Sequence, residues 1–280
     1  MKRILFLFLI CFSIQSCKTS TIQNELNSAA YLNSLYKNHQ YFELRDKFEE
    51  NSESLSEKDQ LILSSKIYSV FNDRKKSNDA INKVFEKFKN DLTEPELIDL
   101  LEIKMMNSVF LYDYAEALKT SKLLLEIPSL SEEKRKDFSN VAIIYNELKN
   151  VPKQEKLLRK SEIPISIDLA GLSRIPATIN KLQENVVFDT GANFSVITDS
   201  LAIKAGIPIG KNSFEVRAVT GNMVESHIGV ADWLKVGNSL FKNVVFLVFP
   251  EESMNFPEVN YSINSILGFP VISAMEEIQL

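Results

Sequence analysis

The sequence predicts a multidomain chain with an α domain followed by a β domain. The α domain is a helical-repeat array over residues 24–160, and the β domain is a closed β-barrel over residues 161–280. The first 160 residues contain no glycine, and all eight glycines lie from Gly171 onward. Glycine serves the tight turns and bulges that hairpins of strands require. The apolar residues follow the same division, because their spacing changes from helical to strand-like near residue 163. Both observations favour helices first and strands second.

Helix starts in residues 24–160 are marked by capping pairs, namely Ser56 with Asp59, Thr93 with Glu96, and Ser131 with Glu133 nearby. Breaks between apolar segments, at residues 39–41, 73–76, 112–114 and 150–152, recur about every 36 to 38 residues, a period typical of two-helix repeats. In period and alternation this part resembles tetratricopeptide repeats. Such an array either offers a concave surface to a partner or acts as a spacer that stacks for its own stability, and the sequence leaves both open.

The first residues have the order of a secretory signal. Lys2 and Arg3 precede an apolar run over residues 4–12, which is about half the length of a membrane-spanning helix. Ile14, Ser16 and Cys17 then stand where a bacterial lipoprotein carries its cleavage and lipidation motif. This resemblance implies a signal peptide at 1–16, a lipid on Cys17, a tether over 17–23, and a membrane anchor at the periplasmic or outer-membrane face of the cell envelope. The alternative is an ordinary signal peptide with an incidental cysteine.

Composition excludes several function classes. The only other cysteine, Cys11, lies in the segment that would be removed, so neither a disulfide nor a zinc site built on cysteines is expected. His39 and His227 fall in different predicted domains, which argues against a metal centre, and no cofactor is expected. The formal charge is −5 and no basic patch indicates a nucleic-acid partner.

Short runs of β-branched residues predict the strands of the second part. They lie at residues 163–168, 175–179, 184–188, 213–219, 223–236 and 240–249, with turns expected at 220–222 and 237–238.

The chemistry is indicated where the strand at 184–188 ends, in the segment 187–197 with Asp189-Thr190-Gly191-Ala192 at its centre. Two apolar residues, this tetrad, two variable positions, Ser195 and two aliphatic residues form a pattern that resembles the retropepsin-like aspartic proteases. A later element of that family, apolar-apolar-Gly, is matched at Ile266-Leu267-Gly268, followed by a helix that Pro270 could start. The resemblance covers about residues 163 to 280.

The resemblance implies catalysis by Asp189, Thr190 and Gly191. Two carboxylates about 3 Å apart cannot both ionise, so a pair of aspartates shares one proton and activates water against a peptide carbonyl. Thr190 would hold the two loops together, and Gly191 would let the backbone approach substrate. The chain has one such motif, so the resemblance implies a homodimer in which each copy supplies one aspartate.

The same resemblance implies substrate contacts from Ala192, Asn193, Thr220, Gly221 and Gly268, with the hairpin around residues 219–223 as a flap. Two positions depart from retroviral members, which carry an acid and an arginine where this chain has Asn193 and Phe269. Both partners of that ion pair are absent together.

These observations predict an aspartic-type endopeptidase, a hydrolase of peptide bonds anchored at the bacterial cell envelope. Two alternatives remain: an inactive protease-fold lipoprotein that binds an envelope protein or peptide, and a structural lipoprotein in which the helical array dominates. The intact Asp189-Thr190-Gly191-Ala192 loop favours the enzyme.

Overall fold

The computed structural model describes residues 28–217 and 223–279, which fall into two compact units. The first unit ends at Asn107 and the second begins at Ser108. The predicted signal peptide, Cys17 and the tether therefore lie outside the described residues. Within those residues, no helix combines the length and apolarity that crossing a bilayer requires.

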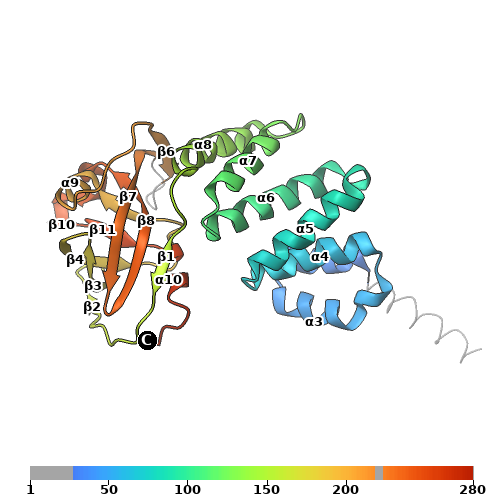
Figure 1. Cartoon of the computed structure of the whole chain (residues 1–280), viewed down its shortest axis with the longest axis horizontal. Coiled ribbons are helices and arrows are strands. Elements are labelled where there is room, and N and C mark those ends of the chain that lie inside the picture. Colours follow the sequence, from blue (N-terminus) through green and yellow to red (C-terminus); the bar gives the residue numbers. More distant parts are fainter. Residues whose placement is uncertain (1–27, 218–222, 280) are drawn as a thin grey trace, which may run out of the picture. The chain divides into compact units, whose positions relative to one another are not determined.

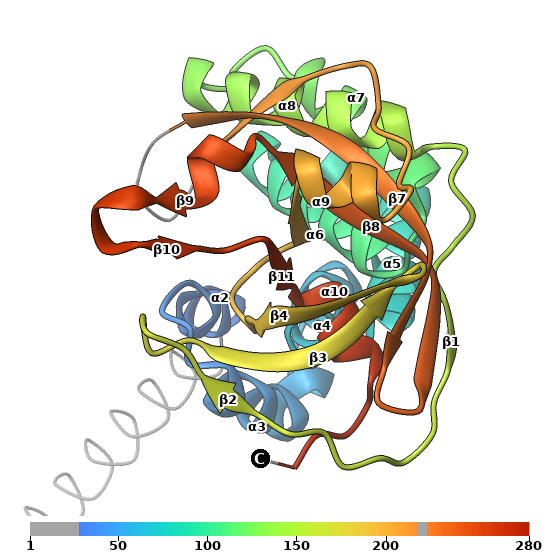
Figure 2. The same ribbon diagram turned by 90° about the vertical axis from the view of Figure 1, so that its left-hand side faces the viewer.

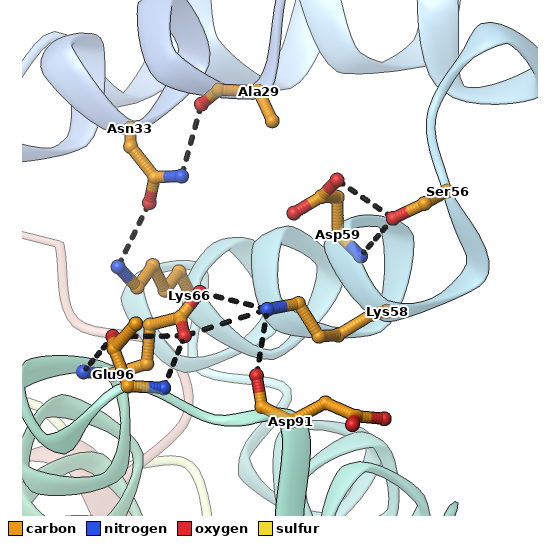
Figure 3. Close-up of polar contacts among 9 residues, drawn as sticks. Ala29, Asn33, Ser56, Lys58, Asp59, Lys66, Asp91 and Glu96 are labelled. Atoms are coloured by element: carbon orange, nitrogen blue, oxygen red, sulfur yellow. Dashed lines mark hydrogen bonds and ion pairs between the residues drawn. The ribbon is translucent and has the colours of Figure 1, made fainter. Parts of the chain in front are cut away.

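The first unit is helical, and its elements are labelled in Figure 1. The helices are α2 (Ala29–Lys37), α3 (Tyr41–Asn51), α4 (Glu57–Val70), α5 (Arg74–Phe88) and α6 (Glu94–Phe110), with short 3₁₀ turns η1 (Ser52–Ser54) and η2 (Lys89–Asp91). Helix α6 runs on into the second unit. The predicted starts are confirmed. The Ser56 side chain accepts from the Asp59 amide at 3.1 Å, and the Thr93 amide donates to Glu96 at 2.8 Å (Figure 3).

Three of the predicted breaks are turns between consecutive helices. His39, Asn72 and Tyr112 have positive φ angles of 59°, 68° and 55°, a left-handed conformation that ends a helix. Each turn joins two successive helices, α2 to α3, α4 to α5, and α6 to α7 (Tyr114–Leu125). The helix-turn-helix alternation is confirmed, whereas the tetratricopeptide character of the array stays a prediction.

Polar side chains connect the first helices of successive pairs. Lys66 of α4 is only 4% exposed, and its ammonium donates to Asn33 of α2 at 2.9 Å and lies 3.3 Å from Asp99 of α6. Lys58 also reaches from α4 to α6, at 3.3 Å from Glu96 (Figure 3). A buried charge costs folding free energy unless it is paired, so the Lys66 contacts fix the register of these helices.

The second unit begins with α7 and α8 (Glu132–Leu148) and continues as a β domain. Its strands are β1 (Glu155–Leu157), β2 (Ser166–Ile167), β3 (Ser173–Ile179), β4 (Leu182–Phe188), β5 (Ser195–Thr198), β6 (Phe214–Arg217), β7 (Met223–Val236), β8 (Ser239–Phe249), β9 (Asn255–Phe256), β10 (Tyr261–Ser262) and β11 (Ser265–Leu267). Between them lie α9 (Asp199–Lys204), η3 (Glu251–Met254), η4 (Pro257–Val259) and, at the end, α10 (Phe269–Ala274).

Six of these strands are joined in a continuous ring. The order is β8-β5-β11-β4-β3-β7, and β7 pairs again with β8. Strand β11 lies parallel to β4 and antiparallel to β5. Figure 2 shows β3, β4, β7 and β8 around the domain, with β11 next to β4. The side chains that fill the centre include Ile179, Ile197, Leu234, Phe241 and Phe246, all at most 1% exposed.

The longer strands lie where the sequence predicted them, as do the short strands β6 and β11 and the helix α10 that begins beside Pro270. Segment 163–168 is a strand only at Ser166–Ile167, and β1, α9 and the β9-β10 hairpin were not predicted. The change from helices to strands falls between Leu148 and Glu155, close to the predicted residue 160. The compact units divide elsewhere, because α8 packs on β6 and β7 and so joins the β domain.

A nearly buried ion pair ties the β9-β10 hairpin to the rest of the second unit. Arg174 of β3 donates to Asp168 at 2.7 Å, with side chains 15% and 11% exposed, and the Tyr261 hydroxyl of β10 donates to the same carboxylate oxygen. Burial raises the pKa of Asp168. Hydrogen bonds from Tyr261, Arg174 and two backbone amides lower this pKa by a larger amount, so the net shift is downward.

This lowered pKa predicts a pH-dependent contribution to stability. An aspartate has a pKa of about 3.9 in an unfolded chain, so Asp168 stabilises the folded state above about pH 4, and that contribution is lost as the pH falls below it. We expect Asp168→Asn to lower the denaturation midpoint at pH 6 and to have a smaller effect at pH 3. The exposed Glu252→Gln serves as control. An equal effect of Asp168→Asn at both pH values would contradict the assignment.

Candidate active site

The Asp189 loop leaves the end of β4 and returns as β5, with β11 between the two strands. Val187 pairs with Ile266 and Phe188 with Leu267 in the parallel β4-β11 ladder. The Asp189 amide continues this ladder by donating to the Leu267 carbonyl at 3.1 Å. The backbone of Asp189 is therefore fixed by the sheet, and its side chain projects from the point where the strand ends.

Within the loop, the Gly191 amide donates to Asp189 Oδ1 at 2.8 Å. This hydrogen bond orients the carboxylate from its own loop. Asp189 is half-buried, while Thr190 and Gly191 are exposed. A single copy thus presents one oriented carboxylate next to an open face of the loop.

Gly268 lies against the base of the loop at a distance that no other residue allows. A Cβ atom at this position would stand 2.4 Å from the Phe194 carbonyl oxygen and 2.7 Å from the Ser195 nitrogen. The Gly268 amide donates to the buried Ser195 hydroxyl at 3.1 Å, and the next amide, of Phe269, donates to the Ala192 carbonyl at 2.8 Å. Both ends of the loop are therefore bonded to the segment from Leu267 to Phe269.

The structure brings together all six of the predicted site residues that it describes. Asp189, Thr190, Gly191, Ala192 and Asn193 form one loop, and Gly268, which follows β11, supports it. Their roles in catalysis and substrate contact stay predictions. Thr220 and Gly221, together with the predicted flap turn, lie outside the described residues.

No metal centre accompanies the loop in the part of the chain that the structure describes, since no three His, Cys, Asp or Glu side chains gather there. Within those residues His227 Nδ1 lies 3.0 Å from the Gly210 carbonyl oxygen, a contact with the backbone of a neighbouring segment.

Two contacts of the helices with the β domain could not be predicted from the sequence. Helix α8 reaches the β6 strand through Lys136 and Glu215, 3.4 Å apart, and its Glu147 accepts a hydrogen bond from Asn212. The turn between α6 and α7 reaches α10, where the Phe110 and Phe269 rings meet edge to face at 5.8 Å. No local sequence pattern marks such long-range pairs.

The comparisons with known proteins fall on this same region. Residues 175–271 match the family model described as aspartyl protease. Among solved structures the chain is similar to a retropepsin-like aspartic protease from Rickettsia conorii, at 18% identity and a TM-score of 0.32 over 46% of this chain and 86% of that one. It is also similar to the EIAV protease, at 20% identity and a TM-score of 0.30 over 41% and 98% of the two chains.

A third similar structure is the retroviral protease-like domain of Ddi1 from Leishmania major, at 16% identity and a TM-score of 0.27 over 38% of this chain and 79% of that one. No curated protein matches the chain. The family match begins within β3 and ends within α10, so it includes the Asp189 loop and Gly268. The match to the aspartyl protease family model therefore falls on the C-terminal part of the chain, where the Asp189 loop lies.

The close approach of Gly268 predicts that this glycine cannot be replaced. We expect Gly268→Ala to lower the free energy of unfolding by about 3 kcal/mol, the upper end of the usual cost of overpacking, because the added methyl group would overlap the Phe194 backbone. Chemical denaturation measures this. Gly171→Ala is the matched control: its Cβ would meet open space, and its φ of +80° predicts a loss of only about 1 kcal/mol. Equal losses in the two variants would contradict this account.

Proposed function

We propose that this chain is an aspartic endopeptidase that hydrolyses peptide bonds through a pair of Asp189 carboxylates, one from each copy of a homodimer. The observation that carries the proposal is the Asp189 loop, oriented by the Gly191 amide and supported from below by Gly268. In the same proposal, the ring of six strands is the closed barrel of a retropepsin-like domain, and the helices of the first unit are a tetratricopeptide-like array.

The mechanism requires a second carboxylate. Two aspartates at close range share one proton, so one of them is ionised and the other protonated. The ionised carboxylate takes a proton from a water molecule, whose oxygen attacks the carbonyl carbon of the peptide. The other carboxylic acid donates a proton to the departing nitrogen, and the peptide bond breaks with one water consumed.

A second copy of the chain has an available edge on this domain. Strand β2 pairs only with β3 among the described strands. Large apolar side chains in and next to β2 are exposed to solvent. Ile167 of β2 is 66% exposed, and its neighbours Leu169 and Ile165 are 90% and 49% exposed. An exposed apolar edge strand favours pairing with another strand. This supports dimerisation along β2.

The decisive experiment is cleavage of a peptide library by the chain from Lys18 onward, beside the Asp189→Asn variant, between about pH 4 and pH 7. We expect cleavage that is lost in the variant, because an amide cannot act as the base. Oligomeric state is measured on the same samples by sedimentation. Cleavage should follow the fraction of dimer.

Two further variants in that experiment test whether the dimer forms along β2. Ile167→Lys should reduce both the dimer and the cleavage, because the charge would lie on the exposed edge. Ile203→Lys is the matched control, since Ile203 is 69% exposed on α9, outside that edge. A dimer without cleavage, or cleavage that survives in Asp189→Asn, would favour the alternative of an inactive protease-fold lipoprotein that binds an envelope protein or peptide.

The proposal includes a lipid anchor on Cys17 that holds the protein at the periplasmic or outer-membrane face of the cell envelope. Its support is the order of charged, apolar and small residues that ends at Cys17. We expect the full chain to fractionate with membranes and Cys17→Ser to lose that association, because acyl chains supply the membrane affinity. Cys11→Ser is the matched control and should remain with membranes. A membrane-bound Cys17→Ser variant would refute the anchor.

A further inference from the structure

The Asp189 loop is bonded to the segment that runs from the last residue of β11, Leu267, through Gly268 into the first residue of α10, Phe269. The Asp189 amide donates to Leu267, the Gly268 amide donates to the Ser195 hydroxyl, and the Phe269 amide donates to the Ala192 carbonyl. Phe269 and Pro270 begin α10. A displacement of the first turn of α10 would therefore be transmitted to both ends of the loop.

The first turn of α10 is itself held by the turn between α6 and α7. The Phe110 ring meets the Phe269 ring edge to face, with centroids 5.8 Å apart and planes at 84°. The Tyr112 hydroxyl donates to the Pro270 carbonyl at 2.8 Å and accepts from the side-chain amide of Gln154 at 2.9 Å. These residues all belong to the compact unit that begins at Ser108.

The geometry of these contacts is restrictive. The Pro270 carbonyl lies in the first turn of α10, where Tyr112 supplies it with a hydroxyl donor. Tyr112 has the left-handed φ of 55° in this turn, and the two hydrogen bonds of its hydroxyl fix the direction of its side chain. Burial raises the pKa of Tyr112 to about 12, which keeps the hydroxyl protonated as a donor over the whole physiological range. An edge-to-face ring pair adds directional packing beside this hydrogen bond.

We infer that Phe110 and Tyr112 are positioning residues for the Asp189 loop, acting through Phe269 and Pro270. The functional unit of the protein therefore starts at the end of α6 and not at the first strand. This inference rests on the proposed peptidase function for its kinetic consequence. Its structural consequence, the stability of the bond between the Phe269 amide and Ala192, can be measured independently.

The test compares the full-length protein with Tyr112→Phe and Phe110→Ala. Hydrogen exchange at the Phe269 amide should accelerate about fivefold or more in both variants, because a support of its hydrogen bond is lost. Peptide cleavage should lose roughly 10- to 100-fold in kcat, since small misplacements of a reacting group cost rate. KM should stay within about twofold, because the substrate contacts are intact.

Matched controls separate positioning from general destabilisation. Tyr114→Phe removes the hydroxyl of a buried tyrosine two residues away, and it should leave both the exchange of the Phe269 amide and kcat unchanged. Phe110→Leu keeps an apolar side chain in place and should recover part of the kcat lost in Phe110→Ala. If Phe110→Ala does not fold, Tyr112→Phe decides the test, because it removes a single oxygen atom.

The outcomes separate this inference from the proposed function. Wild-type exchange at Phe269 in folded Tyr112→Phe and Phe110→Ala would overturn the inference, whatever the cleavage assay gives. A wild-type protein that cleaves no peptide, with accelerated exchange in both variants, would remove the peptidase proposal and leave the positioning role supported. If Tyr112→Phe and Phe110→Ala lose no more kcat than Tyr114→Phe does, the inference is also overturned.

Discussion

The close contact between Gly268 and the backbone of Phe194 is the constraint on which the Asp189 loop depends. It lets β11 lie between β4 and β5, so that one short strand bonds to both sides of the loop. Because the Gly268 backbone meets the Phe194 backbone with no side chain between them, the loop has little freedom to change shape. The orientation of the Asp189 carboxylate by the Gly191 amide follows from that rigidity.

A second constraint is the number of catalytic carboxylates that one chain can supply. The chain contains one Asp-Thr-Gly motif, whereas a shared-proton dyad needs two carboxylates. Thr190, Gly191 and Ile167 are exposed in the single copy, and β2 pairs with β3 alone among the described strands, as the proposed dimer requires. Under the proposed function, activity would depend on protein concentration, and the proposed membrane anchor would raise the effective concentration of the two copies.

The sequence predicted most of the long elements, because their signals are local. Glycine distribution separated helices from strands, and the capping pairs at Ser56 and Thr93 located helix starts that the structure confirms. The Asp189 loop was found through an eleven-residue pattern. Short elements such as β1 and β9 carry too few residues to show a period. The contact between Phe110 and Phe269 spans a long stretch of chain, so only the folded structure reveals it.

The smallest of those short elements has a consequence for the domain as a whole. Strand β1, Glu155–Leu157, pairs with Leu240, Phe241 and Lys242 of β8 on the side that β5 leaves uncovered. It comes from the segment that follows α8, ahead of the compositional change near residue 160. A fragment cut at that change would present three open backbone positions next to a fully buried phenylalanine, and open edges recruit other chains. The segment before the ring of strands thus covers an edge of β8 that would otherwise be open to other chains.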